Sequence, residues 1–224
     1  MTRAALFDVD GTLVDTNYLH VTAWWEAFRQ AGHQVPMRAV HHAIGLGGTD
    51  LIGHVLGEDR DTDQDAAISA AHKTLYGTHF DRLEAFDDAG RLLRALAGEG
   101  WIVVLVTSAG GAELGALRAA VDADDVIAAT ASADDVDEGK PAPEPVAHAL
   151  DLVGANARDS VLVGDSVWDM KSARRAGVTP LAVLSGGIPG EDLTRAGAAK
   201  VYDDTAHLLS SLASSVFTRQ EGDG

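Results

Sequence analysis

The stretch ALFDVDGTLVD, from Ala5 to Asp15, decides the fold. A short apolar run at residues 4–7 predicts a buried strand, and two carboxylates two residues apart, Asp8 and Asp10, follow it. Because side chains alternate between the two faces of a strand, both carboxylates are expected on the same side. Ligands of open α/β sheets bind at the carboxyl ends of the strands. The stretch therefore predicts an acidic site at that edge of a sheet.

The paired carboxylates indicate a particular chemistry. Two such groups repel each other, so both stay ionised only where a cation or hydrogen-bond donors compensate. Hard oxygen ligands with room for water favour Mg²⁺. One aspartate can then attack as a nucleophile while the other moves a proton, and the metal neutralises the transferred group. Taken alone, the short motif fits equally well a strand followed by an acidic turn, with Gly11 as its tight residue.

Composition narrows the classes of function. The 224 residues carry a formal charge of −17, and 46% are hydrophobic, which is enough for one large domain or a domain with an insert. This acidity argues against nucleic acid as a partner, because phosphate backbones need basic surface. The chain has no cysteine, which excludes disulfides, thiolate metal sites and cysteine catalysis.

The sequence carries no apolar run near the ~20 residues that a membrane span needs. The apolar run at the N-terminus is short and stops at Asp8, unlike the apolar core of a signal peptide. We therefore expect a cytoplasmic protein that does not bind membranes. The pattern makes no prediction about its oligomeric state.

The chain is helical in pattern after the first strand. Apolar residues recur at helical spacing over residues 15–30, where Asp15 or Thr16 is expected to cap the helix, and again over residues 38–80. Glycines at positions 45, 47 and 48 interrupt this pattern. We expect a helical cap over residues 16–83, inserted into an α/β core domain made of residues 1–15 and 84–224.

Apolar strands alternate with amphipathic helices from Phe86 onward. The expected strands cover residues 101–106, 126–129, 160–163, 180–184 and, at the edge, 200–202. Continuous apolar strands separated by helices indicate a parallel sheet covered on both faces. The predicted fold class is therefore α/β, a doubly wound parallel sheet with an inserted α-helical cap.

Three further polar signatures follow the expected strands. Thr107 and Ser108 precede small residues at a helix start, which suits an anion, although these hydroxyls also suit capping of that helix. Lys140 stands in a proline-rich loop, GKPAP, where it can neutralise a phosphate or be solvated surface. Asp165 directly follows a buried strand, and Asp169, one helical turn later, also suits the N-terminus of a helix.

These four signatures together, DxDGT, the hydroxyl after the second strand, GKP and GDSxxD, resemble the haloacid dehalogenase-like hydrolase superfamily over essentially the whole chain. The inserted helices are similar to the small cap of its phosphoglycolate phosphatase and β-phosphoglucomutase branch. The resemblance implies a Rossmann-like core and a Mg²⁺-dependent phosphatase that hydrolyses a small phosphorylated metabolite, a phosphate monoester, through an aspartyl-phosphate.

The resemblance also implies a role for each motif residue. Asp8 would be the nucleophile, and Asp10 would protonate the leaving oxygen and then activate water. The implied Mg²⁺ ligands are Asp8, the backbone carbonyl of Asp10 and Asp165, with Asp169 in or just behind that shell. The phosphoryl oxygens would be held by Thr107, the Ser108 amide and Lys140. Gly47 and Gly48 are expected to face the substrate, because glycine lets the backbone approach a ligand closely.

Two alternatives remain open. A phosphomutase of the β-phosphoglucomutase type is favoured by Asp15, Thr16 and His20, which resemble that branch. In that branch a cap loop supplies an Arg, whereas the matching loop here, GLGGTD at 45–50, has neither Arg nor Lys, which favours hydrolysis. A non-enzymatic phosphate-binding regulatory protein is expected to have lost at least one motif residue. None is missing, which favours an active enzyme.

Overall fold

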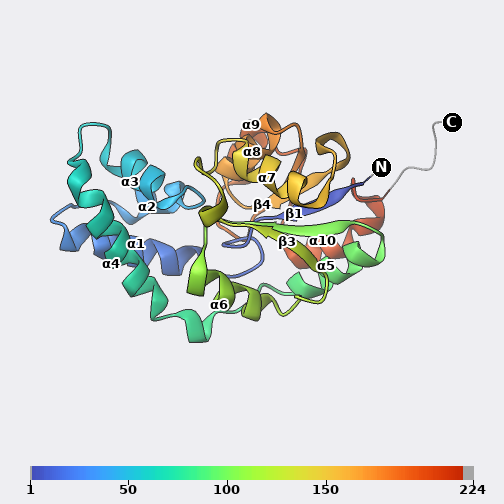
Figure 1. The fold of residues 1–224 in the computed structure, drawn as a ribbon, viewed down its shortest axis with the longest axis horizontal. Coiled ribbons are helices and arrows are strands. Elements are labelled where there is room, and N and C mark those ends of the chain that lie inside the picture. The colour runs from blue at the N-terminus through green and yellow to red at the C-terminus, as the bar shows by residue number, and fades with distance from the viewer. Residues whose placement is uncertain (1, 219–224) are drawn as a thin grey trace.

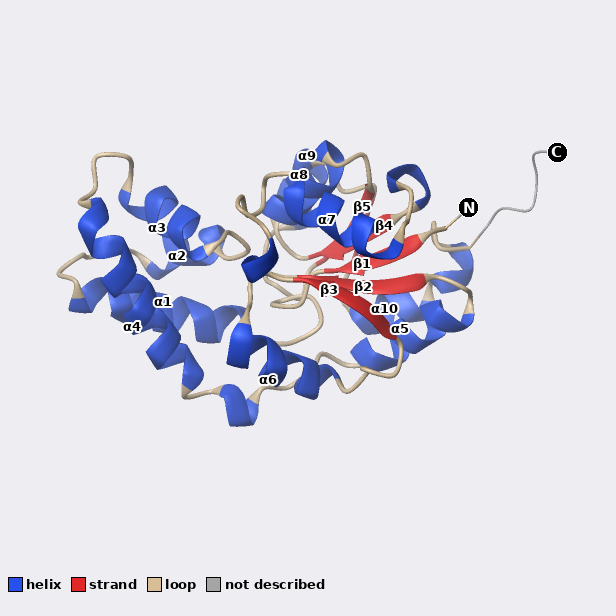
Figure 2. Ribbon diagram, in the orientation of Figure 1, coloured by secondary structure: helices blue, strands red, loops and turns tan. Residues whose placement is uncertain are grey.

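The computed structural model describes residues 2–218, and its centre is a six-stranded parallel sheet in the order β3-β2-β1-β4-β5-β6 (Figures 1 and 2). The strands are β1 (Ala4–Phe7), β2 (Ile102–Val106), β3 (Ile127–Ala131), β4 (Val161–Gly164), β5 (Thr179–Val183) and β6 (Lys200–Tyr202). From β1 the chain adds β2 and β3 toward one edge of the sheet, and from β4 it adds β5 and β6 toward the other edge. The sheet is therefore doubly wound. The fold class predicted from the sequence is confirmed.

The described residues form ten α-helices. Those preceding β2 are α1 (Asn17–Gln30), α2 (Met37–Ala43), α3 (Gly48–Leu56), α4 (Asp65–Gly77) and α5 (Ala89–Gly98). Those following it are α6 (Gly111–Val121), α7 (Glu144–Val153), α8 (Val167–Arg175), α9 (Gly190–Ala196) and α10 (Thr205–Ser210). No helix among residues 2–218 combines the length and the apolar character needed to cross a membrane.

The apolar run of β1 is buried on both faces of the sheet. Ala5 and Phe7 pack in one cluster with apolar residues of α5, α6 and α10. Ala4 and Leu6 point to the other face, where α7 and α8 cover them. Figure 1 shows α5 and α10 on one side of the sheet and α7, α8 and α9 on the other. This two-sided cover explains why the strand is continuously apolar rather than alternating.

Helices α1 to α4 form a separate group, at the left of Figures 1 and 2. They share an apolar cluster of their own, built on Trp24 and Phe28 of α1 together with residues of α2, α3 and α4. The chain enters and leaves this group along two adjacent segments, since the Asp15 amide donates to the Glu84 carbonyl at 3.0 Å. The domain boundaries at 15/16 and 83/84 stay a prediction, and the predicted core extends past the described residues.

Two local expectations differ from the structure. Thr16 occupies the N-cap position of α1 without a capping side-chain bond, and its Oγ1 instead donates to Asp10 Oδ1 at 2.7 Å. A hydrogen bond to the partly buried Asp10 carboxylate is stronger than a bond between neutral groups, and it turns the Thr16 hydroxyl toward Asp10. Strand β3 spans Ile127–Ala131 rather than 126–129, and the ladder to β2 shifts register at its start.

Truncating a buried leucine on the α5 face tests the packing. Leu93 is fully buried in the cluster against β1 and β2. We expect Leu93→Ala to lower the free energy of unfolding by ~2–5 kcal/mol, because it leaves a cavity as well as losing buried area. Leu152→Ala, on the exposed side of α7 where Leu152 is 47% accessible, should change it by less than ~0.5 kcal/mol. Urea denaturation of both variants measures this, and equal losses would contradict the assigned faces.

Candidate active site

The four sequence signatures meet at the carboxyl edge of the sheet. Asp8 follows β1, Thr107 follows β2 and Asp165 follows β4, while Lys140 comes from the loop before α7 and Asp169 from the first turn of α8. Asp8, Asp165 and Asp169 are buried, and each has a carboxylate oxygen within 4.8 Å of the others. Because β1 lies between β2 and β4, the strand order places these groups next to one another.

Lys140 neutralises part of this acidic group. Its Nζ lies 2.5 Å from Asp8 Oδ1 and 2.7 Å from Asp169 Oδ1, and donates to the Val106 carbonyl at 3.1 Å. Burial acts to lower the pKa of Lys140, but the carboxylates of Asp169 and Asp8 outweigh it and raise that pKa. The lysine therefore stays a buried ammonium that holds two carboxylates.

One ammonium does not balance three carboxylates. Burial raises the pKa of Asp8 well above its usual value, against the lowering effect of Lys140. Burial and the neighbouring charge of Asp169 raise the pKa of Asp165 to about 7. The ionised forms of both groups are therefore disfavoured until more positive charge arrives. These buried oxygen donors can hold a metal ion.

Two residues that sequence reasoning did not assign support Asp165. Thr12 Oγ1 lies 3.2 Å from Asp8 Oδ2 and 3.0 Å from Asp165 Oδ1, and its single hydrogen serves one of them at a time. Asn17 Nδ2 donates to Asp165 Oδ2 at 2.8 Å. Thr12 stood within the DxDGT motif, whereas nothing local in the sequence marked Asn17. Gly11, with φ +76°, is required here because a Cβ would collide with Asn17 and Asp165.

Asp10 is held from the side of the α1–α4 helices. Its Oδ1 accepts from Thr16 and lies 3.2 Å from His20 Nε2. Burial acts to raise the pKa of Asp10, but the charge of His20 and bonds from His20 and Thr16 outweigh it and lower that pKa. Likewise, the bond to Asp10 overcomes burial and raises the pKa of His20. Asp8 and Asp10 line one small cavity, but their carboxylates have different partners.

Two further groups near His20 were missed by the sequence reasoning. His72 Nε2 lies 3.1 Å from His20 Nδ1, and burial with the charge of His20 lowers the pKa of His72 to about 2. His72 is therefore neutral. Glu113 Oε1 lies 3.7 Å from His20 Nε2, and burial raises the pKa of Glu113 to about 7. These residues come from α4 and α6, far from the first motif in the chain.

A cavity of about 410 Å³ lies beside the Lys140 loop. It is lined by five of the predicted site residues: Gly47, Gly48, Thr107, Ser108 and Lys140. Thr107 Oγ1 accepts from the Ala109 amide at 3.0 Å, and α6 begins three residues beyond Ser108 with Gly110 at its N-cap. Thr107 and Ser108 therefore shape the loop before α6 rather than cap the helix.

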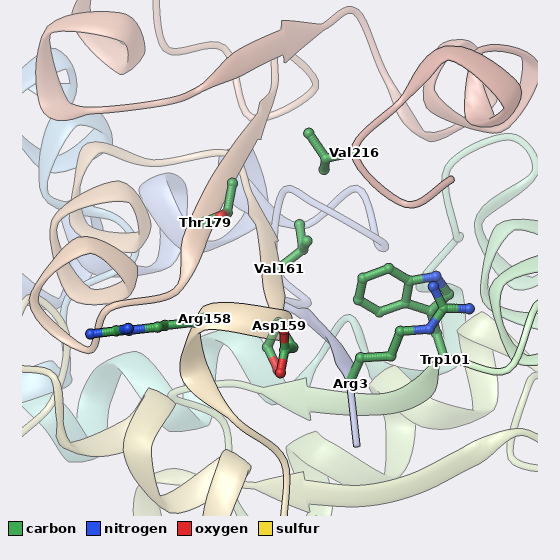
Figure 3. A pocket seen from close by; sticks show the side chains of 8 residues that line it. Arg3, Trp101, Arg158, Asp159, Val161, Thr179 and Val216 are labelled. Atoms are coloured by element: carbon green, nitrogen blue, oxygen red, sulfur yellow. The ribbon is translucent and has the colours of Figure 1, made fainter. Parts of the chain in front are cut away.

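A second large cavity, of about 450 Å³, lies at the opposite, amino edge of the sheet (Figure 3). The Arg3 guanidinium there lies 4.5 Å from the centroid of the Trp101 ring, and Arg158 and Asp159 also line the cavity. None of the residues singled out by the sequence signatures lines it. The residues singled out by the sequence signatures are therefore concentrated at the carboxyl edge.

The fold and site define a class: a doubly wound α/β protein with a buried acidic site at the carboxyl edge of its parallel sheet. A model of the haloacid dehalogenase-like hydrolase family matches residues 2–177. A phosphoglycolate phosphatase from Rhodospirillum rubrum is 30% identical over 221 residues, which cover 93% of this chain and 90% of that protein. The chain belongs to the haloacid dehalogenase-like hydrolase family.

Solved structures agree with this assignment. A crystal structure of a hydrolase from Pseudomonas syringae superposes with a TM-score of 0.90 at 32% identity, covering 96% of this chain and 99% of that one. A β-phosphoglucomutase from Clostridium difficile gives a TM-score of 0.80 at 18% identity, with 93% of each chain covered. This second similarity establishes a shared fold alone.

The raised pKa of Glu113 predicts a pH dependence of stability. Between pH 4.5 and about 7 the unfolded chain loses the Glu113 proton while the folded protein keeps it, so stability falls as pH rises through this window. The variant Glu113→Gln cannot titrate, so it does not lose stability in this way as pH rises. We expect the free energy of unfolding of Glu113→Gln, minus that of the native protein, to increase by on the order of 2–3 kcal/mol across the window.

Urea denaturation at several pH values measures this difference. Glu99→Gln is the matched control, because Glu99 is exposed at the end of α5. A pH-independent difference for Glu113→Gln would show that Glu113 titrates normally in the folded protein.

Proposed function

We propose that this protein is a Mg²⁺-dependent phosphatase that hydrolyses a small phosphate monoester through an aspartyl-phosphate on Asp8. The single observation that carries the proposal is the buried Asp8 carboxylate, which is paired with Lys140 and adjacent to Asp165 and Asp169. The relative from Rhodospirillum rubrum, named phosphoglycolate phosphatase, also supports phosphate-ester hydrolysis. The acidic composition is consistent with a small phosphorylated metabolite, rather than nucleic acid, as the partner.

The proposed reaction has two halves that use the same two aspartates. An Asp8 oxygen forms a bond to phosphorus as the bond to the leaving oxygen breaks, and Asp10 passes to that oxygen a proton that it takes from its partner His20. Asp10 then takes a proton from water as the water oxygen attacks phosphorus and the bond to Asp8 breaks. The pairing of Asp10 with His20 and Thr16 positions its carboxylate for both transfers.

The donor set fits a hard divalent cation. The buried carboxylates of Asp8 and Asp165 are the proposed ligands, together with the Asp10 backbone carbonyl, and Asp169 lies beside them. When bound, Mg²⁺ would supply positive charge against the phosphoryl oxygens and against the carboxylates that Lys140 leaves unbalanced. Burial, together with this unbalanced charge, raises the pKa values of Asp8 and Asp165.

The phosphoryl oxygens are proposed to bind Thr107, the Ser108 amide and Lys140, which line a single cavity. Gly47 and Gly48 line the same cavity from the start of α3, which supports their proposed contact with substrate. We also propose that residues 16–83 act as a cap domain over this edge of the core.

Phosphomutase activity is the second candidate, and the fold shared with β-phosphoglucomutase is the observation in its favour. The residues of loop 45–50 that line the large cavity are two glycines, Thr49 and Asp50. None of them supplies a cation for a second phosphate, which favours hydrolysis.

Replacing Asp165 tests the metal site without an activity assay. We expect Mg²⁺ at 100 times its Kd to stabilise the native protein by ~2.7 kcal/mol and Asp165→Asn by far less. Without metal, Asp165→Asn should be at least as stable as the native protein, because it removes a buried charge. Asn17 Oδ1, which has no hydrogen-bond partner within residues 2–218, can turn to accept from the new amide. Thermal unfolding in Mg²⁺ and in chelator measures both effects, and equal Mg²⁺ stabilisation of the two proteins would exclude this site.

The activity test is phosphate release from a panel of small phosphate esters. We expect Asp8→Asn to lower kcat at least ~1,000-fold, because it removes the nucleophile, and chelator to abolish turnover. Asp151→Asn, an exposed change on α7, should leave turnover intact. A preparation that releases no phosphate but isomerises a hexose 1-phosphate with a bisphosphate primer would establish the mutase instead.

A further inference from the structure

A second group of metal-ligand side chains lies beside the acidic site, and it includes a ring nitrogen. Asp10 comes from the loop after β1, His20 from α1 and Glu113 from the first turn of α6. A carboxylate oxygen of each acid and a ring nitrogen of His20 all lie within 4.8 Å of one another. All three residues line the cavity of about 90 Å³. Their ligand atoms therefore converge on one small space.

The separations of these atoms suit a tetrahedral zinc ion. His20 Nε2 lies 3.2 Å from Asp10 Oδ1 and 3.7 Å from Glu113 Oε1. Zn²⁺ binds nitrogen and oxygen at ~2.0–2.2 Å, which places two tetrahedral ligands about 3.3–3.6 Å apart. The two carboxylates are at most 4.8 Å apart, a gap that a rotation of the partly exposed Glu113 side chain can close. The cavity leaves space for a water molecule as the fourth ligand.

His72 holds the His20 ring in the form that a metal needs. His72 Nε2 lies 3.1 Å from His20 Nδ1, and His72 is neutral because burial and the charge of His20 lower its pKa to about 2. A neutral His72 can accept the Nδ1 hydrogen of His20, which leaves the lone pair of His20 Nε2 for a metal. Histidines that bind metals almost always donate their other ring nitrogen to a neighbouring acceptor in this way.

A buried hydroxyl beside the same group points independently to a bound molecule. The Tyr76 ring is stacked on His20, with centroids 3.8 Å apart, and its hydroxyl has no hydrogen-bond partner within residues 2–218. Burial raises the pKa of Tyr76, and the charges of Asp10 and Glu113 raise it further, so this hydroxyl lies within reach of both charges. An unsatisfied buried hydroxyl costs ~1–3 kcal/mol. A water molecule bound to an ion among these residues would accept its hydrogen bond.

Charge and donor type indicate which metal fits. The two ionised carboxylates balance a divalent cation. An imidazole nitrogen favours Zn²⁺ and similar transition metals, whereas the oxygen-only group of Asp8, Asp165 and Asp169 suits Mg²⁺. Lys73 also lines the cavity and opposes any cation there. Its side chain is exposed, so water and salt screen its charge more than they screen the charges of the ligands.

We propose that Asp10, His20 and Glu113 form an inhibitory site for Zn²⁺, separate from the proposed Mg²⁺ site. An ion bound there takes the place of the hydrogen between His20 Nε2 and Asp10 Oδ1, and that proton passes to solvent. Asp10 then receives no proton to pass to the leaving oxygen. The inhibition rests on the proposed phosphatase function, whereas the binding site does not.

Co²⁺ tests the site by spectroscopy, because four-coordinate Co²⁺ absorbs visible light far more strongly than six-coordinate Co²⁺. The background is Asp165→Asn, which disables the proposed Mg²⁺ site. We expect this protein to give an intense band with one equivalent of Co²⁺, and Zn²⁺ to displace that band. Adding Glu113→Gln should weaken Zn²⁺ binding at least ~10-fold, because one of three protein ligands loses its charge. Titration calorimetry with Zn²⁺ measures the affinities.

Two further variants on the same background serve as controls. Lys73→Gln should strengthen Zn²⁺ binding by ~2- to 5-fold, because it removes a screened positive charge from the cavity wall. Glu99→Gln, an exposed change at the end of α5, should leave the affinity unchanged. Equal Zn²⁺ affinity with and without Glu113→Gln would show that the ion binds elsewhere. A band that the native protein gives and Asp165→Asn lacks would place the ion at the proposed Mg²⁺ site. Either result overturns the inference.

Phosphate release in excess Mg²⁺ tests the inhibition. We expect Zn²⁺ to inhibit the native protein, and Glu113→Gln to need at least ~10-fold more Zn²⁺ for the same fractional loss of its own turnover. Equal inhibition of the two proteins would overturn the inhibitory role and leave the phosphatase function standing. If neither protein releases phosphate with Mg²⁺ alone, the proposed function and the inhibition both fall, and the binding titrations still decide the Zn²⁺ site.

Discussion

The buried ion pairs of Lys140 with Asp8 and Asp169 are the interaction on which the rest of this site depends. They join three distant parts of the chain: the end of β1, the loop before α7 and the first turn of α8. Removing the ammonium of Lys140 would leave these buried carboxylates uncompensated and would cost ~3–5 kcal/mol. Because the ammonium lies against Asp8, the same contact that holds the strand ends together positions the proposed nucleophile.

Neutral hydrogen-bond donors hold the excess carboxylates around the Lys140 ammonium in place. Thr12 and Asn17 donate to Asp165, and Ser166 donates its amide and hydroxyl to Asp169. These neutral donors orient the carboxylates without cancelling their charge. The carboxylates are therefore held by hydrogen bonds and keep their negative charge, an arrangement that suits a small divalent cation.

The α1–α4 helices are tied to the core at the edge that carries the chemistry. His41 Nε2 lies 2.8 Å from the Gly186 carbonyl, to which Asn17 also donates, and Trp168 Nε1 donates to the His42 carbonyl. Asp10 is bound by Thr16 and His20 at the start of α1. His20 lines the small cavity over Asp8 and Asp10 and also holds the Asp10 carboxylate, so one contact joins the proposed cap to the proposed proton-transfer group.

The sequence by itself determined the strand ends and their polar residues, because apolar runs, turns and short motifs are local features. Asp8, Lys140, Thr107 and Asp165 were all identified in this way, although their roles remain proposals. Only the tertiary structure brought Asn17 to Asp165, Glu113 to His20 and Asp50 beside Gly139. These contacts depend on strand order and on how α1, α3 and α6 pack. No short-range sequence pattern encodes the distance between residues so far apart in the chain.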